Sequence, residues 1–146
     1  MNESDHRAAL DRLLELTLRL HEDINRGLAG RGLTVSRTSL LWTLRRTGPC
    51  PQRVLAEALG VTARTVTGLV DALADAGLVT REPHPTDRRS TLVTATESGT
   101  ALVAELEREQ AEFGRRLFAG MSGERFTGLV DGLTDVLDAL RGPRGA

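Results

Sequence analysis

The sequence has a single cysteine, no lysine, no tyrosine and only 3% aromatic residues among its 146 positions. One cysteine cannot form an internal disulfide, which favours a reducing compartment, and we expect a cytoplasmic protein. Apolar runs stay far below the roughly eighteen residues that a membrane-spanning helix needs. The amino-terminal stretch is charged from its start and lacks the apolar core of a signal peptide. The sequence therefore predicts neither a secreted nor a membrane-embedded chain.

Motifs of catalysis and of cofactor binding are also missing. His6, His21 and His84 lie far apart and have no carboxylate or thiol at the spacing of a metal site. No Gly-rich phosphate loop and no nucleophile–base pair at a known spacing is present. We therefore expect no metal, no cofactor and no enzymatic activity.

Charge is distributed unevenly along a chain whose net charge is only −1. Residues 31–92 contain nine arginines and five acidic residues, whereas residues 1–30 contain four and six, and residues 93–146 six and nine. A basic middle between two acidic ends predicts that the middle segment meets an anion such as a nucleic acid.

Hydrophobic periodicity predicts a mainly α-helical chain that carries one small β-hairpin. The expected order is a helix over 6–28, a helix capped by Thr34, short helices over 51–60 and 62–77, strands over 78–83 and 90–96, and two final helices capped by Thr96 and Ser122. In the last helix, apolar residues repeat at intervals of 4, 3, 4 and 3, which is typical of a helix that packs along a partner helix. They are Phe126, Val130, Leu133, Leu137 and Leu140.

The two short helices have the pattern of a helix-turn-helix. This motif needs a small residue where its helices cross, a glycine that can adopt positive φ in the turn, and an apolar anchor in the second helix. Ala56, Gly60 and Val66 occupy these positions. Such a motif places the amino-terminal residues of its second helix in the major groove of DNA.

The outward-facing side chains of that second helix are the candidate base contacts. Arg64 alone among them can bind guanine through two hydrogen bonds, although a solvated surface arginine is the ordinary alternative. The candidates are Thr62, Arg64, Thr65 and Thr67.

The hairpin that follows carries adjacent arginines, Arg88 and Arg89, in its turn. A wing beside a groove-bound helix reaches the neighbouring minor groove, whose negative potential attracts arginine. Asp87 is expected to pair with one of these arginines and so to support the turn. A polar turn with an internal ion pair is the alternative interpretation, but it does not explain the local excess of positive charge.

These residues resemble the MarR family of winged helix-turn-helix transcription regulators. The resemblance depends on LAEALGVTARTVTGLVDALADAGLV, followed by the wing PTDRRSTLVTATESG with its Pro-x-Asp-Arg-Arg turn and its Thr-x-x-Gly helix start. It implies a winged helix-turn-helix DNA-binding domain over residues 33–96, flanked by a helical dimerisation region over residues 1–32 and 97–146. The dimerisation residues would be Leu10, Leu13, Phe126, Val130, Leu133, Leu137 and Leu140.

The resemblance implies a cytoplasmic homodimer that binds a pseudo-palindromic operator in double-stranded DNA and usually represses nearby genes. Arg88 and Arg89 would be wing contacts, and members often carry Arg or Lys where this chain has Gly68, which shifts the expected base contact to Arg64. The recognition-helix contacts would be Thr62, Arg64, Thr65 and Thr67, and the contacts with the DNA backbone Ser36, Arg37 and Arg53.

An anionic or phenolic small molecule, or oxidation, often releases DNA from members of this family. The resemblance places a pocket near His21, Thr38, Trp42 and Arg45. Trp42 is nevertheless expected in the core more than in the pocket, and His21, which could hydrogen-bond a ligand, fits an ordinary satisfied or exposed histidine. Cys50 is expected to be a small buried residue rather than a redox sensor.

Two other functions stay open on the sequence alone. One is a winged-helix module that binds protein, with the wing arginines meeting acidic side chains, and the other is a DNA binder that responds to no effector. Salt dependence separates the protein-binding module from a DNA binder, because phosphate contacts lose affinity steeply as salt rises.

Overall fold

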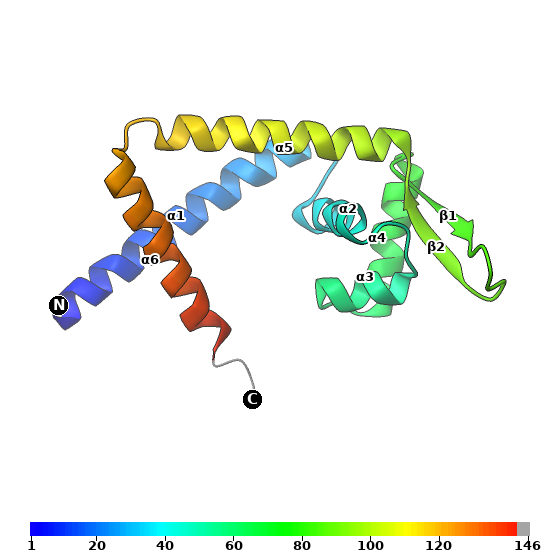
Figure 1. Ribbon diagram of the computed structural model, residues 1–146, viewed down its shortest axis with the longest axis horizontal. Coiled ribbons are helices and arrows are strands. Elements are labelled where there is room, and N and C mark those ends of the chain that lie inside the picture. Colours follow the sequence, from blue (N-terminus) through cyan, green and yellow to red (C-terminus); the bar gives the residue numbers. More distant parts are fainter. Residues whose placement is uncertain (143–146) are drawn as a thin grey trace. The chain divides into compact units, whose positions relative to one another are not determined.

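The computed structural model describes residues 1–142, which separate into two compact units: Met1–Ala104, and the residues that follow from Glu105. The elements follow one another as α1 (Glu3–Ala29), α2 (Val35–Thr47), α3 (Gln52–Leu59), α4 (Ala63–Asp75), β1 (Val79–Pro83), β2 (Thr91–Ala95), α5 (Glu97–Phe118) and α6 (Gly123–Arg141) (Figure 1). This is the order that hydrophobic periodicity predicts, and the mainly helical class with one antiparallel hairpin is confirmed.

Hydroxyl side chains begin the helices where the sequence predicts them. The Thr34 hydroxyl accepts a hydrogen bond from the backbone N–H of Arg37 at 3.1 Å, and the Ser122 hydroxyl accepts one from Arg125 at 3.3 Å. The first helix starts earlier than predicted because Asn2 and Asp5 accept from each other's backbone N–H at 3.0 and 2.9 Å. This capping box satisfies two amide groups that the helix leaves without partners.

The core of the first unit is built from the short helices and the hairpin. Val66, the predicted anchor of the second short helix, is fully buried, and Gly60 ends α3 in the left-handed conformation with φ of 66°. Within residues 1–142, the other large side chains that are less than 2% exposed are Leu40, Leu41, Leu55, Val70, Leu73, Val79 and Val93. Burial of these side chains positions α4 beside the hairpin (Figure 1).

The hairpin pairs in antiparallel register from Val79 opposite Ala95 to Pro83 opposite Thr91. Cys50 adds one further pairing, because the Cys50 N–H donates to the Val93 carbonyl at 3.2 Å and the Cys50 carbonyl accepts the Val93 N–H at 2.8 Å. Cys50 is buried, as expected for a small apolar residue. A one-residue strand has no periodicity, and for that reason the sequence did not predict this pairing.

Thr96 and Gly99 fix α5 to the end of the hairpin. The Thr96 hydroxyl donates to the Gly77 carbonyl at 2.7 Å and accepts the Gly99 N–H at 3.1 Å. A Cβ atom on Gly99 would overlap with the Leu78 carbonyl oxygen. The Thr-x-x-Gly start of this helix therefore has two physical tasks: the threonine caps the helix, and the glycine permits the close approach.

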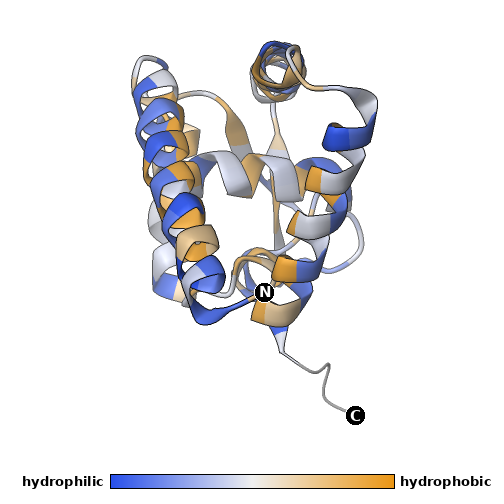
Figure 2. Cartoon of the chain, turned by 90° about the vertical axis from the view of Figure 1, so that its left-hand side faces the viewer, coloured by the Kyte–Doolittle hydropathy of each residue, from blue (hydrophilic) through white to orange (hydrophobic). Residues whose placement is uncertain are grey.

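The long helices carry apolar side chains that stay exposed in the single chain. On α1, Leu10 and Leu18 are 54% and 69% exposed, and on α6, Leu137 and Leu140 are 51% and 79% exposed. Coloured by hydropathy, the helical ribbons show apolar and hydrophilic residues interleaved (Figure 2). No helix within residues 1–142 is both long enough and apolar enough to cross a membrane.

Candidate nucleic-acid interface

The amino-terminal end of α4 presents an exposed arginine on an ordered turn. The Thr62 hydroxyl accepts the Thr65 N–H at 3.1 Å, and the two threonine hydroxyls lie 3.0 Å apart in hydrogen-bond contact. Arg64, between them, is exposed, and its side chain forms no hydrogen bond or ion pair within residues 1–142. Its guanidinium group is consequently available to a ligand without first breaking an internal contact.

The wing tip is ordered by two side chains that accept backbone hydrogen bonds. His84 Nδ1 accepts the N–H groups of Thr86 and Asp87 at 3.1 and 3.0 Å. Asp87 Oδ1 accepts the backbone N–H of Arg89 at 3.0 Å. The predicted ion pair between Asp87 and an arginine side chain is wrong: its carboxylate instead closes the turn through the backbone, an arrangement typical of aspartate in turns.

Arg88 and Arg89 extend from this turn and are exposed. Neither guanidinium group forms a hydrogen bond or ion pair within the described part of the chain. Because the Asp87 carboxylate bonds to the backbone, neither arginine side chain at the tip is held in an ion pair with it. The first unit thus has two exposed cationic points: Arg64 on α4, and the two arginines on the wing.

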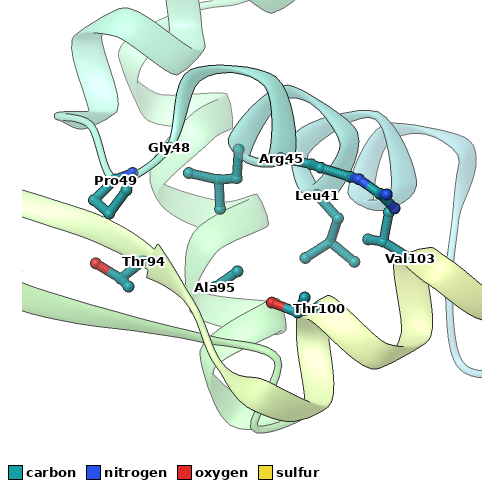
Figure 3. A pocket seen from close by; sticks show the side chains of 9 residues that line it. Leu41, Arg45, Gly48, Pro49, Thr94, Ala95, Thr100 and Val103 are labelled. Atoms are coloured by element: carbon teal, nitrogen blue, oxygen red, sulfur yellow. The ribbon is translucent and has the colours of Figure 1, made fainter.

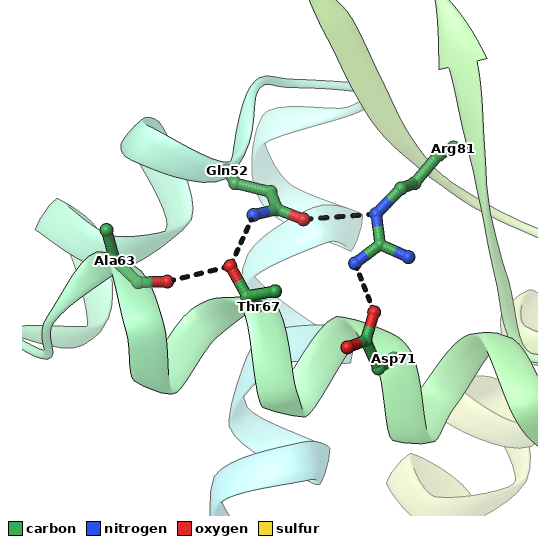
Figure 4. A network of polar contacts seen from close by, with 5 residues as sticks. All are labelled: Gln52, Ala63, Thr67, Asp71 and Arg81. Atoms are coloured by element: carbon green, nitrogen blue, oxygen red, sulfur yellow. Dashed lines mark hydrogen bonds and ion pairs between the residues drawn. The ribbon is translucent and has the colours of Figure 1, made fainter.

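A polar network that the sequence did not reveal joins β1, α3 and α4 (Figure 4). Arg81 donates from Nη2 to Asp71 Oδ1 at 2.6 Å and from Nε to Gln52 Oε1 at 3.1 Å. Gln52 Nε2 donates to the Thr67 hydroxyl at 3.1 Å, and that hydroxyl donates to the Ala63 carbonyl at 3.0 Å. One signal could have found Arg81: it lies two residues after the buried Val79, and so on the same face of the strand.

Thr67, a predicted base contact, therefore has its hydroxyl proton committed to its own helix. Towards a ligand it can offer its methyl group or an oxygen lone pair, but it cannot donate a hydrogen bond without breaking the contact with Ala63.

The predicted contacts to the DNA backbone have different surroundings. Arg53 on α3 and Ser36 on α2 are exposed and have no partner within residues 1–142. Arg37 is half-buried, and its Nη1 donates to the Gly32 carbonyl at 3.1 Å. Arg37 thus stabilises the turn between α1 and α2, whatever else it contacts.

A cavity of about 290 Å³ lies in the first unit where α2, the hairpin and the start of α5 meet (Figure 3). Arg45 extends along it from α2, and the hydroxyl of Thr100 lines it from α5. The remaining lining residues are Leu41, Leu44, Gly48, Pro49, Thr94, Ala95 and Val103. Within residues 1–142 no cluster of three or more His, Cys, Asp or Glu side chains is placed to hold a metal ion.

Of the four predicted pocket residues, only Arg45 lines this cavity. Thr38 is 3% exposed, and its hydroxyl donates to the Thr34 carbonyl at 2.9 Å. His21 is exposed on α1, where its Nε2 contacts the Asn25 amide at 2.8 Å. Trp42 is 36% exposed, so the expectation that it belongs to the core is wrong, since its helix buries the face that carries Leu40, Leu41 and Leu44.

Comparison with known proteins agrees with this architecture. The family model described as MarR family matches residues 33–91. The chain is 34% identical over 113 residues to ML2140, an uncharacterized HTH-type transcriptional regulator of Mycobacterium leprae, and the match covers 77% of this chain and 78% of that protein. It is 41% identical over 71 residues to the HTH-type transcriptional repressor NicR of Pseudomonas putida, covering 49% and 45%.

Among solved structures, FabT of Streptococcus pneumoniae in complex with DNA superposes with a TM-score of 0.83 at 19% identity, over 93% of this chain and 97% of that chain. This likeness shows a shared fold. Together with the helix-turn-helix, the wing and the extent of the sequence match, it leads to one assignment: the chain belongs to the MarR family of winged helix-turn-helix transcriptional regulators, DNA-binding proteins that are not enzymes.

Proposed function

We propose that the chain is a repressor that binds a pseudo-palindromic operator in double-stranded DNA as a cytoplasmic homodimer. The observation that carries the proposal is the set of three exposed arginine side chains on α4 and the wing tip, none of which has an internal partner within residues 1–142. A guanidinium group that is in no internal ion pair gains one on binding DNA and breaks none. The three are Arg64, Arg88 and Arg89.

In this proposal α4 enters the major groove, where Arg64 reads a guanine, and the wing enters the adjacent minor groove. Thr62 and Thr65, at the start of α4, lie where backbone N–H groups and hydroxyls favour a phosphate. Thr67 contributes its methyl group. Ser36, Arg37 and Arg53 contact the DNA backbone and set the register of the protein on the duplex.

A second copy of the chain is the proposed partner of the exposed apolar side chains on the long helices. Leu10 and Leu137 are each more than half exposed, and a monomer would leave these surfaces in water. A twofold-symmetric dimer presents two wings and two recognition helices, and so requires an operator with matching symmetry. Repression is supported by the similarity to NicR, which is named a repressor.

Fluorescence anisotropy on a duplex from upstream of the chain's own gene, against a scrambled duplex, tests the proposal. We expect tight binding to the first duplex only, with the affinity falling by about a thousandfold or more between roughly 50 and 200 mM salt. Equal affinity for both duplexes at low salt would contradict sequence-specific recognition. Weak salt dependence on either duplex would favour a protein-binding module instead.

A second proposal concerns release of the DNA: the cavity beside Arg45 admits a small anionic or phenolic effector. Its volume of about 290 Å³ suits a single aromatic acid, and its lining joins α2 to the end of β2 and the start of α5. A ligand there contacts the elements that hold the wing. Benzoate is expected to release DNA from the unmutated protein and to act more weakly on Arg45→Ala, whereas equal release from both would contradict a role for this cavity.

A further inference from the structure

We propose that Arg81 is a positioning residue for DNA recognition, which fixes the wing against α4 through Asp71 and Gln52. The wing arginines and the recognition helix then reach the two grooves in one fixed geometry. This inference rests on the proposed DNA-binding function, and it assigns a task to three residues that contribute none of the proposed DNA contacts.

The guanidinium group of Arg81 is held at two points on two different helices. Nη2 lies 2.6 Å from Asp71 Oδ1 on α4, and Nε lies 3.1 Å from Gln52 Oε1 at the first residue of α3. The first contact is a short, charge-assisted hydrogen bond. Because a guanidinium group is planar and rigid, two acceptors at different edges fix both its position and its rotation. The strand that carries it is fixed with it.

The network continues along α4 in one direction of hydrogen bonding. Arginine has only donors, so the oxygen of the Gln52 side chain faces Arg81 and its NH₂ group faces the Thr67 hydroxyl. That hydroxyl donates in turn to the Ala63 carbonyl. Ala63, Thr67 and Asp71 are spaced by four residues and lie along one stripe of the helix, as Figure 4 shows. The wing is thus tied to two successive turns of the recognition helix.

The charge on Asp71 offers a decisive test of this assignment. The Arg81 and Asp71 side chains are 35% and 58% exposed, so both are accessible to solvent. In one interpretation Arg81 binds a phosphate directly, and Asp71 competes with the DNA for it. Removing the carboxylate would then tighten DNA binding, as would removing any acid near a polyanion. If Asp71 instead positions the wing through Arg81, the same change weakens binding.

Asp75 provides the matched control, because it is an exposed acid one turn further along α4 and has no partner within the described residues. We expect Asp71→Ala to weaken binding to the upstream duplex about three- to fivefold, and Asp75→Ala to leave it unchanged or tighten it by up to about twofold. In a background that already carries Arg88→Ala and Arg89→Ala, Asp71→Ala is expected to have little effect, since no wing arginines are left to position. Arg81→Lys keeps the charge but cannot hold both acceptors, and is expected to weaken binding as Asp71→Ala does.

Hydrogen–deuterium exchange on the DNA-free protein gives a second, independent readout. Asp71→Ala and Arg81→Lys should each speed exchange over residues 79–95 relative to the unmutated protein and to Asp75→Ala. Unchanged exchange in this segment would overturn the anchoring. Tighter DNA binding by Asp71→Ala, or a loss that persists in full without the wing arginines, would overturn the positioning role. Failure of the unmutated protein to prefer the upstream duplex would instead refute the proposed function, and exchange would still report on the anchoring.

Discussion

Replacing both wing arginines by alanine is expected to reduce the salt dependence of DNA binding by a predictable amount. Arg88 and Arg89 are exposed and form no ion pair within residues 1–142, so each is available to displace condensed counterions from DNA. A homodimer would present four such groups. At about 0.9 in the slope of log K against log salt for each neutralised phosphate, the double change should lower the slope by up to about 3.6.

Anisotropy titrations at several salt concentrations measure this slope directly. The chain offers a matched control in Arg115→Ala with Arg116→Ala, a second adjacent pair that lies on α5, where Arg115 contacts Glu112 at 3.7 Å. Both double variants lose the same net charge, so an effect of net charge alone changes both alike. Only contact at the wing predicts a larger change for the first pair.

The two cationic points should also differ in what they discriminate. Loss of the wing arginines is expected to weaken binding to every duplex, with modest loss of sequence preference, because minor-groove contacts read few base differences. Arg64→Ala should instead relax the base preference at one operator position, where the discrimination against the wrong base should fall by about 1–3 kcal/mol. A slope change below about one for the wing pair, or identical effects of both changes on every sequence, would refute this division of tasks.

Three further changes test the fold and the assembly. Thr96→Val removes the α5 cap and the hydrogen bond to Gly77, and should lower the free energy of unfolding by about 2 kcal/mol. The Thr94 hydroxyl has no partner within residues 1–142, so Thr94→Val should change the free energy of unfolding by less than about 0.5 kcal/mol. Equal losses for the two variants, measured by urea unfolding at one protein concentration, would disprove the reasoning. His84→Ala should weaken DNA binding by loosening the wing tip. His84→Asn should bind DNA more tightly than His84→Ala, because the asparagine side-chain oxygen can accept the N–H two residues further on. Equal DNA affinities of the two variants in anisotropy would argue against this role of the ring. Leu133→Asp should give monomers in size-exclusion chromatography with light scattering, and an intact dimer would exclude α6 from the interface.

Much of the fold could be predicted because its signals lie within four residues of one another. A capping threonine or serine bonds to a backbone N–H only three residues further along the chain. For that reason Thr34, Thr62 and Ser122 begin helices as expected. Gly60 likewise marks a turn with positive φ, because glycine adopts this backbone conformation without a steric penalty. The exposed arginines of the candidate interface could be predicted for a related reason, since they lie in a turn and on a helix start.

The wrong predictions relied on the usual behaviour of a residue type, and they did not consider which face of its helix the residue lies on or which hydrogen-bond partners are near it. Trp42 was expected in the core because tryptophan is usually buried, yet α2 turns a different face inward. Asp87 was expected to pair with an arginine side chain because opposite charges attract. Its carboxylate instead accepts the backbone N–H two residues further on, and this contact costs less side-chain entropy because no long arginine side chain has to be ordered.

The sequence by itself determined the order of the elements, the helix caps at Thr34, Thr62, Thr96 and Ser122, the helix-turn-helix and the two arginines of the wing. Only the tertiary structure decided which residues from distant segments meet. Arg81 contacts Asp71 ten positions away and Gln52 twenty-nine positions away, and Cys50 joins the sheet through Val93. Such contacts depend on how the buried faces of α2, α3, α4 and the hairpin pack together, and no local pattern of residues encodes the distance between two side chains that this packing brings into contact.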